Sequence, residues 1–187
     1  MTANQHSLTT GDCMVPRSVV SNIRAARSSI RDPAAFLRDL RAVAANHDTR
    51  IICFNADMIA GRVHAATAVA RAVRAFEEGV TISNTLEMEA LLFAAGSRQC
   101  TIAASFGIHK GENRVYICCF PARAEVWVAL EPLFRFVQEN WDTIDPDKMK
   151  QLMETFAISP DEITAAGGNG RIVDLVLERV ALLEVIR

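Results

Sequence analysis

Several features that mark common protein classes are missing from this sequence of 187 residues. Aromatic residues make up only 6% of the chain, which argues against an extended stacking platform for nucleic acid. No apolar run approaches the roughly 20 residues that span a bilayer, so we expect no membrane partner. The N-terminus also lacks the charged and then apolar start of a secretory signal. These absences predict a folded cytoplasmic protein.

Cysteine and histidine are present but are not grouped as ligands. The five cysteines contain no Cys-x-x-Cys pair, and most lie within apolar runs, which predicts buried thiols in a reducing compartment. The four histidines are scattered singly, without neighbours at ligand spacing. No Gly-Lys-Ser or Gly-Lys-Thr follows the glycine-rich segment 167–170, so there is no phosphate loop. We therefore expect no metal and no other cofactor.

The net charge of −2 conceals an asymmetry along the chain. Residues 1–74 hold 10 Lys and Arg against 5 Asp and Glu, whereas residues 75–187 hold 10 against 17. The net positive segment 1–74 could bind phosphate groups, whereas the net negative segment 75–187 would repel them. A distribution of charge for solubility alone explains the same imbalance.

The pattern of apolar residues predicts one α+β domain over residues 13–187, after a disordered polar tail at 1–12. It would hold a small, largely antiparallel or mixed β-sheet packed with several α-helices. Strands are expected at 19–30, 51–54, 98–106 and 114–120, the last two joined as a hairpin through 107–111. Helices are expected from Pro33 to Asn46, at 58–78, 85–95 and 125–140, after Asp145-Pro146 and Ser159-Pro160, and at 171–187.

The helix expected at 58–78, capped by Asn55 or Asp57, has two contrasting sides. Apolar positions that include Val63 and Phe76 recur at helical spacing and predict one buried stripe. His64 and Arg71 would then lie on the opposite side, where they could form a basic surface for a nucleic-acid backbone. A solvated helix face explains these two residues equally well.

A second polar signature, Asn84-Thr85-Leu86-Glu87, has the spacing of a capping box. In that interpretation Asn84 accepts from the first helical turn and Glu87 reaches back. The alternative is that free backbone N–H groups at this helix start hold a phosphate or a carboxylate.

A small hydrolase or transferase that uses Cys53 or His64 is a further alternative, because catalytic triads are assembled in space rather than in sequence. Asp57 would complete such a triad. However, Cys53 belongs to an expected buried strand, and nothing nearby resembles a nucleophile turn.

The C-terminal helix carries more apolar residues than one core contact needs. Three of them widen its apolar stripe well beyond the roughly 100° that faces a core. Either the sheet and another helix cover both sides, or the helix binds a partner protein. The residues predicted to contact a partner are Ile172, Val173, Val176, Leu177 and Val180.

Several motifs between residues 51 and 120 together resemble those of a known family. They are Phe54-Asn55-Ala56-Asp57-Met58-Ile59-Ala60-Gly61 with His64, Ile82-Ser83-Asn84 with Glu89, Gly96-Ser97-Arg98-Gln99, and Gly107-Ile108 before Gly111. In order and spacing they resemble the small kinase-binding subunit of the KEOPS complex, the TPRKB-like family, and their spelling suggests an archaeal member. Cys100 stands where that family more often has an aliphatic residue, and the C-terminal third matches only in its helical character.

The resemblance implies an accessory subunit without catalysis of its own. KEOPS makes the threonylcarbamoyladenosine modification of tRNA, and this subunit binds the atypical kinase/ATPase subunit, which in turn binds the threonylcarbamoyl transferase subunit. In archaea it also holds the single-stranded 3′ CCA end of tRNA. By motif position and charge, the RNA-binding residues would be Arg62, His64, Asn84, Arg98, Gln99 and Lys110. A purely structural interaction module without RNA contact is the remaining alternative.

Overall fold

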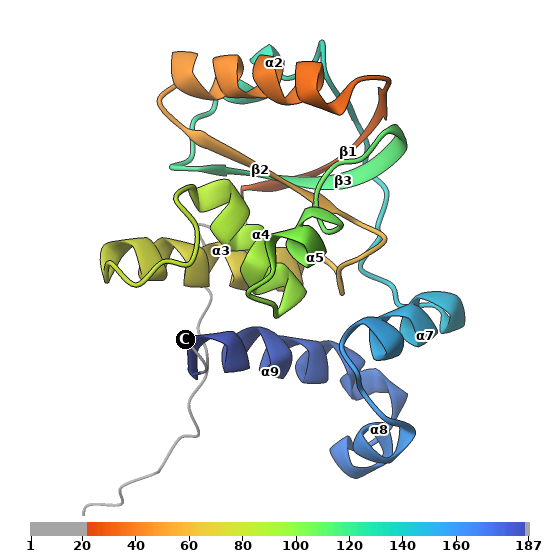
Figure 1. Ribbon diagram of the computed structural model, residues 1–187. Coiled ribbons are helices and arrows are strands. Elements are labelled where there is room, and N and C mark those ends of the chain that lie inside the picture. Colours follow the sequence, from red (N-terminus) through yellow and green to blue (C-terminus); the bar gives the residue numbers. More distant parts are fainter. Residues whose placement is uncertain (1–21, 186–187) are drawn as a thin grey trace, which may run out of the picture.

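The computed structural model describes residues 22–185, and Figure 1 shows a sheet with helix α2 on one face and several helices on the other. The α+β prediction is therefore confirmed. In chain order the elements are β1 (Ile23–Ile30), α2 (Pro33–Asn46), β2 (Arg50–Asn55), α3 (Arg62–Glu77), α4 (Leu86–Ala95), α5 (Cys100–Ala104), β3 (Gly111–Phe120), α6 (Val126–Ala129), β4 (Arg135–Phe136), α7 (Pro146–Thr155), α8 (Pro160–Ala166), the 3-10 turn η1 (Asn169–Arg171) and α9 (Ile172–Val185).

The four strands are antiparallel and lie in the order β2-β3-β1-β4. β3 is central, with Ile117 opposite both Cys53 of β2 and Arg24 of β1. Successive side chains of a strand point to opposite faces, so the sheet separates two cores. Phe54 and Tyr116 pack with α3, α4 and α9, whereas Cys53 and Ile117 pack with α2 and α6. The sheet leaves β2 as an outer strand.

Three helix starts were predicted correctly because their signals are local. Asp32 accepts the backbone N–H groups of the second and third residues that follow it, at 2.9 and 3.2 Å, and Pro33 begins α2. Asp145 caps α7 in the same way. Ser159 and Glu162 form a capping box at the start of α8.

Two predicted elements are wrong. Residues 98–106 do not form a strand; they contain helix α5, so β3 has no hairpin partner there. Ala103 and Phe106, three residues apart, are fully buried, which is helical spacing. The helix predicted at 125–140 stops after α6 because Pro132 lacks an N–H and disfavours helical backbone in the residue before it. The chain then becomes extended, and β4 joins the sheet beside β1.

Helix α3 also differs from its prediction. It begins at Arg62 rather than Met58, with Gly61 as its N-cap, because residues 56–61 form a loop. The predicted stripe is wrong at two positions, since Val63 is 49% exposed and Phe76 is 39% exposed. His64, expected on the outer side, is completely buried. Neighbouring helices α4 and α9 cover this alanine-rich helix on sides that sequence periodicity marked as solvated.

Some predictions concern residues outside the described part of the chain. They are the polar tail 1–12, the first residues of the strand expected at 19–30, and the last two residues of the final helix. Within the described part, that strand is confirmed as β1. Among residues 22–185 no helix has both the length and the apolarity needed to cross a bilayer.

Candidate functional site

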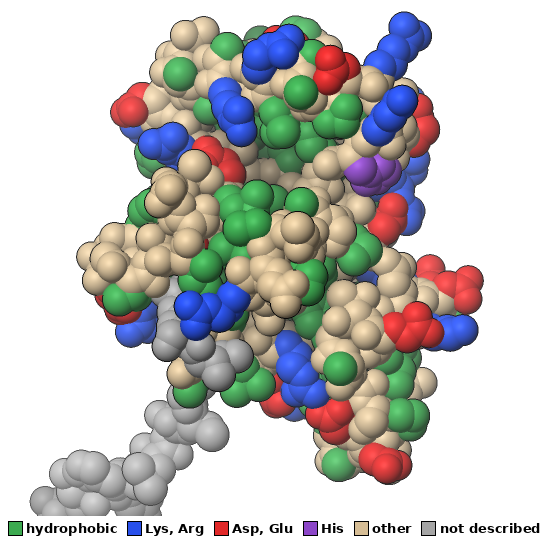
Figure 2. Space-filling model, in the orientation of Figure 1, with side chains coloured by type: hydrophobic (Ala, Val, Ile, Leu, Met, Phe, Trp, Pro, Cys, Tyr) green, Lys and Arg blue, Asp and Glu red, His purple; other side chains and the backbone are tan. Residues whose placement is uncertain are grey.

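A cavity of about 290 Å³ opens between α2 and α4 along the outer edge of β2. Its apolar walls include Leu37 and Leu40 of α2, Leu91 of α4 and Ile108 after α5. Figure 2 shows hydrophobic side chains in this hollow and Lys and Arg side chains on the α2 side. The polar residues that line it are Arg41, Arg50, Thr85 and Glu87.

A second cavity of about 350 Å³ adjoins the first, because Arg50 and Thr85 line both. Its walls are largely apolar: Val73, Phe76, Leu86, Phe120 and Pro121. Arg50, the first residue of β2, is exposed and makes no side-chain hydrogen bond or ion pair with a described residue. We call the two cavities together the β2 groove. The β2 groove is thus apolar, and the guanidinium of Arg50, unpaired among the described residues, lies where its two cavities meet.

Asn84 lines the second cavity, but it does not cap α4. The cap is Thr85, whose Oγ1 accepts the backbone N–H of Met88 at 3.3 Å. Glu87 does not reach back to this turn; instead the fully buried Glu89 accepts the backbone N–H groups of the two residues before Asn84, at 3.0 and 2.7 Å. The predicted capping box is therefore wrong. The same turn leaves the exposed Asn84 at the groove.

His64 cannot contact RNA in this structure, so its assignment as an RNA-binding residue is wrong. The ring is 0% exposed and packs edge-on against Phe156. Nδ1 accepts the N–H of Ala60 at 3.0 Å, so the proton is on Nε2, which donates to the carbonyl of Ala94 at 3.0 Å. Burial lowers the pKa of His64 to about 4. The ring is thus a neutral link between two backbone segments.

The other predicted RNA-binding residues lie outside the β2 groove. Arg62 is partly buried at the start of α3, with its guanidinium 5.5 Å from the ring centre of Tyr116. Arg98 and Gln99 are exposed between α4 and α5, and Lys110 is exposed before β3. The structure does not bring these four residues together with Asn84 at one cavity, and their role in RNA binding stays a prediction.

Sequence reasoning missed Arg41 and Arg50 of the β2 groove. A signal was available for Arg50, because it stands immediately before the buried run that begins at Ile51. No comparable signal marks Arg41, which is one of two arginines in α2. Only the packing of α2 over β2 brings the two together.

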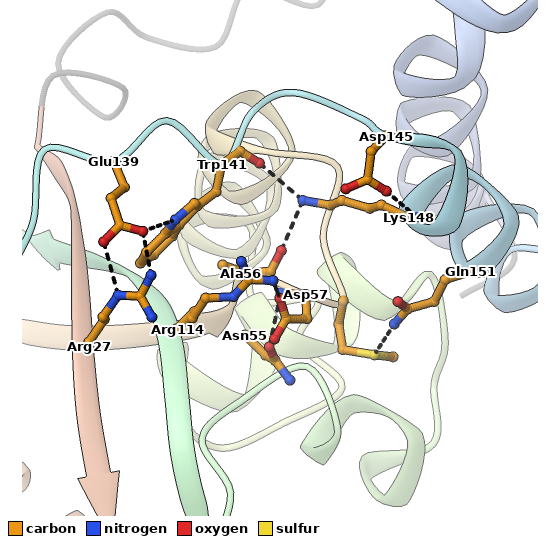
Figure 3. Close-up of polar contacts among 11 residues, drawn as sticks. Arg27, Asn55, Ala56, Asp57, Arg114, Glu139, Trp141, Asp145, Lys148 and Gln151 are labelled. Carbon is orange, nitrogen blue, oxygen red and sulfur yellow. Dashed lines mark hydrogen bonds and ion pairs between the residues drawn. The ribbon is translucent and has the colours of Figure 1, made fainter.

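The motif Phe54 to Gly61 ends strand β2 and continues as a loop that internal contacts hold in place. Asn55 accepts the backbone N–H of Asp57 at 3.0 Å, and Asp57 pairs with Arg114 of β3, as Figure 3 shows. Gly61 has a φ of +84°, and a Cβ added there would lie 2.9 Å from Oδ1 of Asp142. The glycine is therefore needed for both its backbone conformation and its close approach to the segment before α7.

Lys148 of α7 fastens this loop to the C-terminal helices. Its Nζ donates to the carbonyls of Ala56 at 3.0 Å and Trp141 at 3.1 Å (Figure 3). Partial burial of the ammonium lowers the pKa of Lys148. The loop between β2 and α3 consequently fixes the position of α7.

The proposed Cys–His pair is not assembled as a nucleophile and base. Cys53 packs in the core beneath α2, where burial raises the pKa of its thiol. His64 lies in the other core, and both its ring nitrogens are bonded to backbone groups. Within residues 22–185, no three His, Cys, Asp or Glu side chains gather as metal ligands.

A second groove, of about 780 Å³, lies between α7 and the start of α9. Its apolar lining includes Ile144, Met149, Met153, Ile158 and Val173, and Asp145, Lys150 and Glu154 also line it. Methionine side chains are unbranched and flexible, so such a surface adapts readily to an apolar partner. We call it the α7–α9 groove.

The residues predicted to bind a partner divide between this groove and the core. Val176 and Val180 are 0% exposed, so their assignment as partner contacts is wrong. Helices α3, α4, α7 and α8 all contact α9, so its two sides are covered by helices rather than by the sheet and one helix. Val173 is partly exposed and lines the α7–α9 groove; Ile172 also borders it but is buried, with 2% exposure, and Leu177 is partly exposed.

Comparison with curated proteins finds no match to this chain. The family model described as "Kinase binding protein CGI-121" matches residues 20–184, which extend from before β1 into the last turn of α9. This is the family that the motifs between residues 51 and 120 resemble. The chain therefore belongs to the CGI-121 family of kinase binding proteins.

Proposed function

We propose that this chain is a non-catalytic accessory subunit of the KEOPS complex, in which it binds both the atypical kinase/ATPase subunit and the 3′ CCA end of tRNA. The family match over residues 20–184 carries the proposal, because it covers nearly the whole described fold. The kinase subunit would link the chain to the threonylcarbamoyl transferase subunit. Because CCA binding is the role of archaeal members, the proposal also takes this chain as archaeal and acting in the cytoplasm.

The α7–α9 groove is the surface proposed for the kinase subunit. It offers a methionine-rich apolar centre next to Asp145 and Glu154. Protein interfaces bury such centres and leave charged groups at the rim. Because Lys150 also lines the groove and pairs with Glu154, the partner would present an apolar patch with charged groups of both signs around it.

Co-purification with the kinase subunit tests this surface. Val173→Arg places a charge in the groove, at a residue that is only partly buried. We expect it to abolish co-purification while thermal unfolding of the isolated chain stays cooperative. Ile102→Arg is the matched control, because Ile102 is 43% exposed on α5, away from this groove, and should bind normally. Normal binding by Val173→Arg would place the kinase surface elsewhere.

The β2 groove is the surface proposed for the RNA end. Single-stranded ends are recognised through unstacked bases held in pockets, with cations at the backbone. Two adjoining apolar cavities with Arg50 between them suit two such bases and the phosphate that joins them. With Arg41 and Arg50 as the cations that the described residues bring to this groove, binding by the isolated chain should be weak, with a salt slope of about −1.4.

Gel shifts with intact tRNA and with tRNA lacking its last three nucleotides test the RNA claim. The truncated tRNA should bind at least about tenfold more weakly, which corresponds to roughly 1.4 kcal/mol. Arg50→Glu should weaken binding of intact tRNA similarly. Arg38→Glu, an exposed position on α2 outside both cavities, should not. Equal affinity for the two tRNAs would show that the 3′ end is not recognised.

A further inference from the structure

Within residues 22–185, the outer edge of β2 carries backbone groups that pair with no other strand. Among the described strands, β2 has one neighbour, β3. The N–H of Asn55 points away from β3, because it donates to the carbonyl of Phe106 at 2.7 Å. Inward and outward groups alternate along an antiparallel strand. Ile51 and Cys53 therefore direct both their N–H and their C=O groups outward, as Asn55 directs its N–H.

The stretch of β2 with outward groups unpaired in the described chain is short, because hydrogen bonds to other segments occupy the backbone on either side of it. Before it, the N–H of Thr49 donates to a carbonyl of α2 at 3.1 Å; after it, Asn55 bonds to the segment that follows α5. Between these points, the outward groups of Ile51 and Cys53 make no hydrogen bond with a described residue. Both residues line the first cavity of the β2 groove. Main-chain groups in such a place need a partner, which water or a ligand must supply.

We propose that these main-chain groups read a nucleobase of the RNA end. The inference rests on the proposed RNA-binding function and specifies how the β2 groove performs it. Adenine and cytosine each carry an exocyclic amino group beside a ring nitrogen, a donor next to an acceptor, which complements a carbonyl and an N–H on one strand edge. The C=O and N–H groups of one of these two residues, Ile51 or Cys53, bind that base edge.

The walls of the cavity fit the remainder of a nucleotide. Leu40 of α2 and Leu91 of α4 belong to opposite walls, so a flat ring between them has apolar contacts on both faces. Arg41 and Arg50 provide positive charge for the phosphate. The carboxylate of Glu87 can accept a hydrogen bond from an amino group or a ribose hydroxyl.

An added peptide strand is the other ligand known for an open sheet edge. The described edge favours a base, because only Ile51 and Cys53 face outward between the two hydrogen-bonded ends. A typical strand has about five or six residues, which needs a longer open edge. The two arginines beside the edge also match a phosphate, which a peptide lacks.

Amide chemical shifts of the full ¹⁵N-labelled chain test the proposal. The probes are the trinucleotide CCA, the same trinucleotide with every exocyclic amino group replaced by hydrogen, and ribose 5-phosphate. CCA should shift the amides of Ile51 and Cys53, whereas ribose 5-phosphate should leave them in place. The amino-free trinucleotide should bind at least about tenfold more weakly, because it leaves main-chain carbonyls without a donor.

A variant that fills the cavity gives an independent measurement. Leu91→Trp should reduce the affinity for CCA at least about tenfold, and Ile102→Trp, an exposed apolar position outside the groove, should not. If CCA binds but the Ile51 and Cys53 amides do not respond to the base, the inference is wrong while RNA binding stands. If neither CCA nor tRNA binds, the proposed RNA function fails as well. Displacement of CCA by an extended peptide that forms strand contacts with β2 would also overturn the inference.

Discussion

Acid should destabilise this protein through His64. The neutral ring accepts a hydrogen bond from Ala60 and donates one to Ala94, and it is completely buried. Protonation would place a second N–H against the N–H of Ala60 and a charge in an apolar core. The imidazole of His64 therefore binds a proton more tightly in the unfolded chain than in the folded protein.

The size of the effect follows from the two pKa values. The pKa of His64 is about 4 in the folded protein, and an exposed histidine has a pKa of roughly 6.5. Between these values the unfolded state binds more protons, so stability rises with pH. The contribution is complete above about pH 6.5 and is lost as pH falls toward 4, by on the order of 3 kcal/mol. That is a large fraction of the roughly 5–15 kcal/mol typical of a domain.

Urea unfolding between pH 4.5 and pH 8 measures this loss. His64→Gln removes the titrating group, so its free energy of unfolding should vary with pH less steeply than that of the unmodified protein. His109→Gln is the matched control, because His109 is exposed and its removal should leave the steep dependence intact. Carboxyl groups titrate in all three proteins and cancel in the comparison. The same pH slope with and without His64 would refute the reasoning.

Three further predictions follow from buried or constrained groups. Gly61→Ala should lower the free energy of unfolding by about 2 kcal/mol or more, because the added Cβ meets Asp142, whereas Gly170→Ala, with open space around it, should be nearly neutral in the same urea experiment. Glu89→Ala should cost about 2–4 kcal/mol in urea unfolding, because two backbone N–H groups before α4 lose their acceptor; a smaller change would mean that water replaces the carboxylate. Of the four cysteines in the described chain, only Cys100 is exposed, so mass spectrometry after brief alkylation should find it modified and the three buried thiols unmodified; labelling of all four would indicate local opening.

The sequence predicted correctly those parts of the fold that depend on interactions between residues close together in the chain. Aspartate followed by proline starts α2 and α7 because the carboxylate and the proline ring act within one turn. The segment 98–106 was misassigned because a short apolar run fits a strand and a buried helix equally well. The stripe of α3 was misassigned because alanine at most positions hides which side α4 and α9 cover.

The candidate site was harder to predict because it depends on strand order. Nothing local shows that β2 lies at an edge, so the outward groups of Ile51 and Cys53 were invisible in the sequence. The motif identified the family correctly, but the contacts of His64 and Gly61 within it are internal: His64 bonds to two backbone segments, and Gly61 lies against Asp142. A family resemblance alone does not distinguish residues that stabilise the fold from residues that bind a ligand.

The central claim is that kinase and RNA bind to separate surfaces of one small domain. Hydrogen–deuterium exchange of the full chain, alone and saturated with either the kinase subunit or tRNA, tests it most directly. The kinase subunit should protect Pro146–Thr155 and the start of α9 and leave Arg50–Asn55 unchanged, whereas tRNA should do the reverse. Protection of the same segments by both partners would contradict the claim.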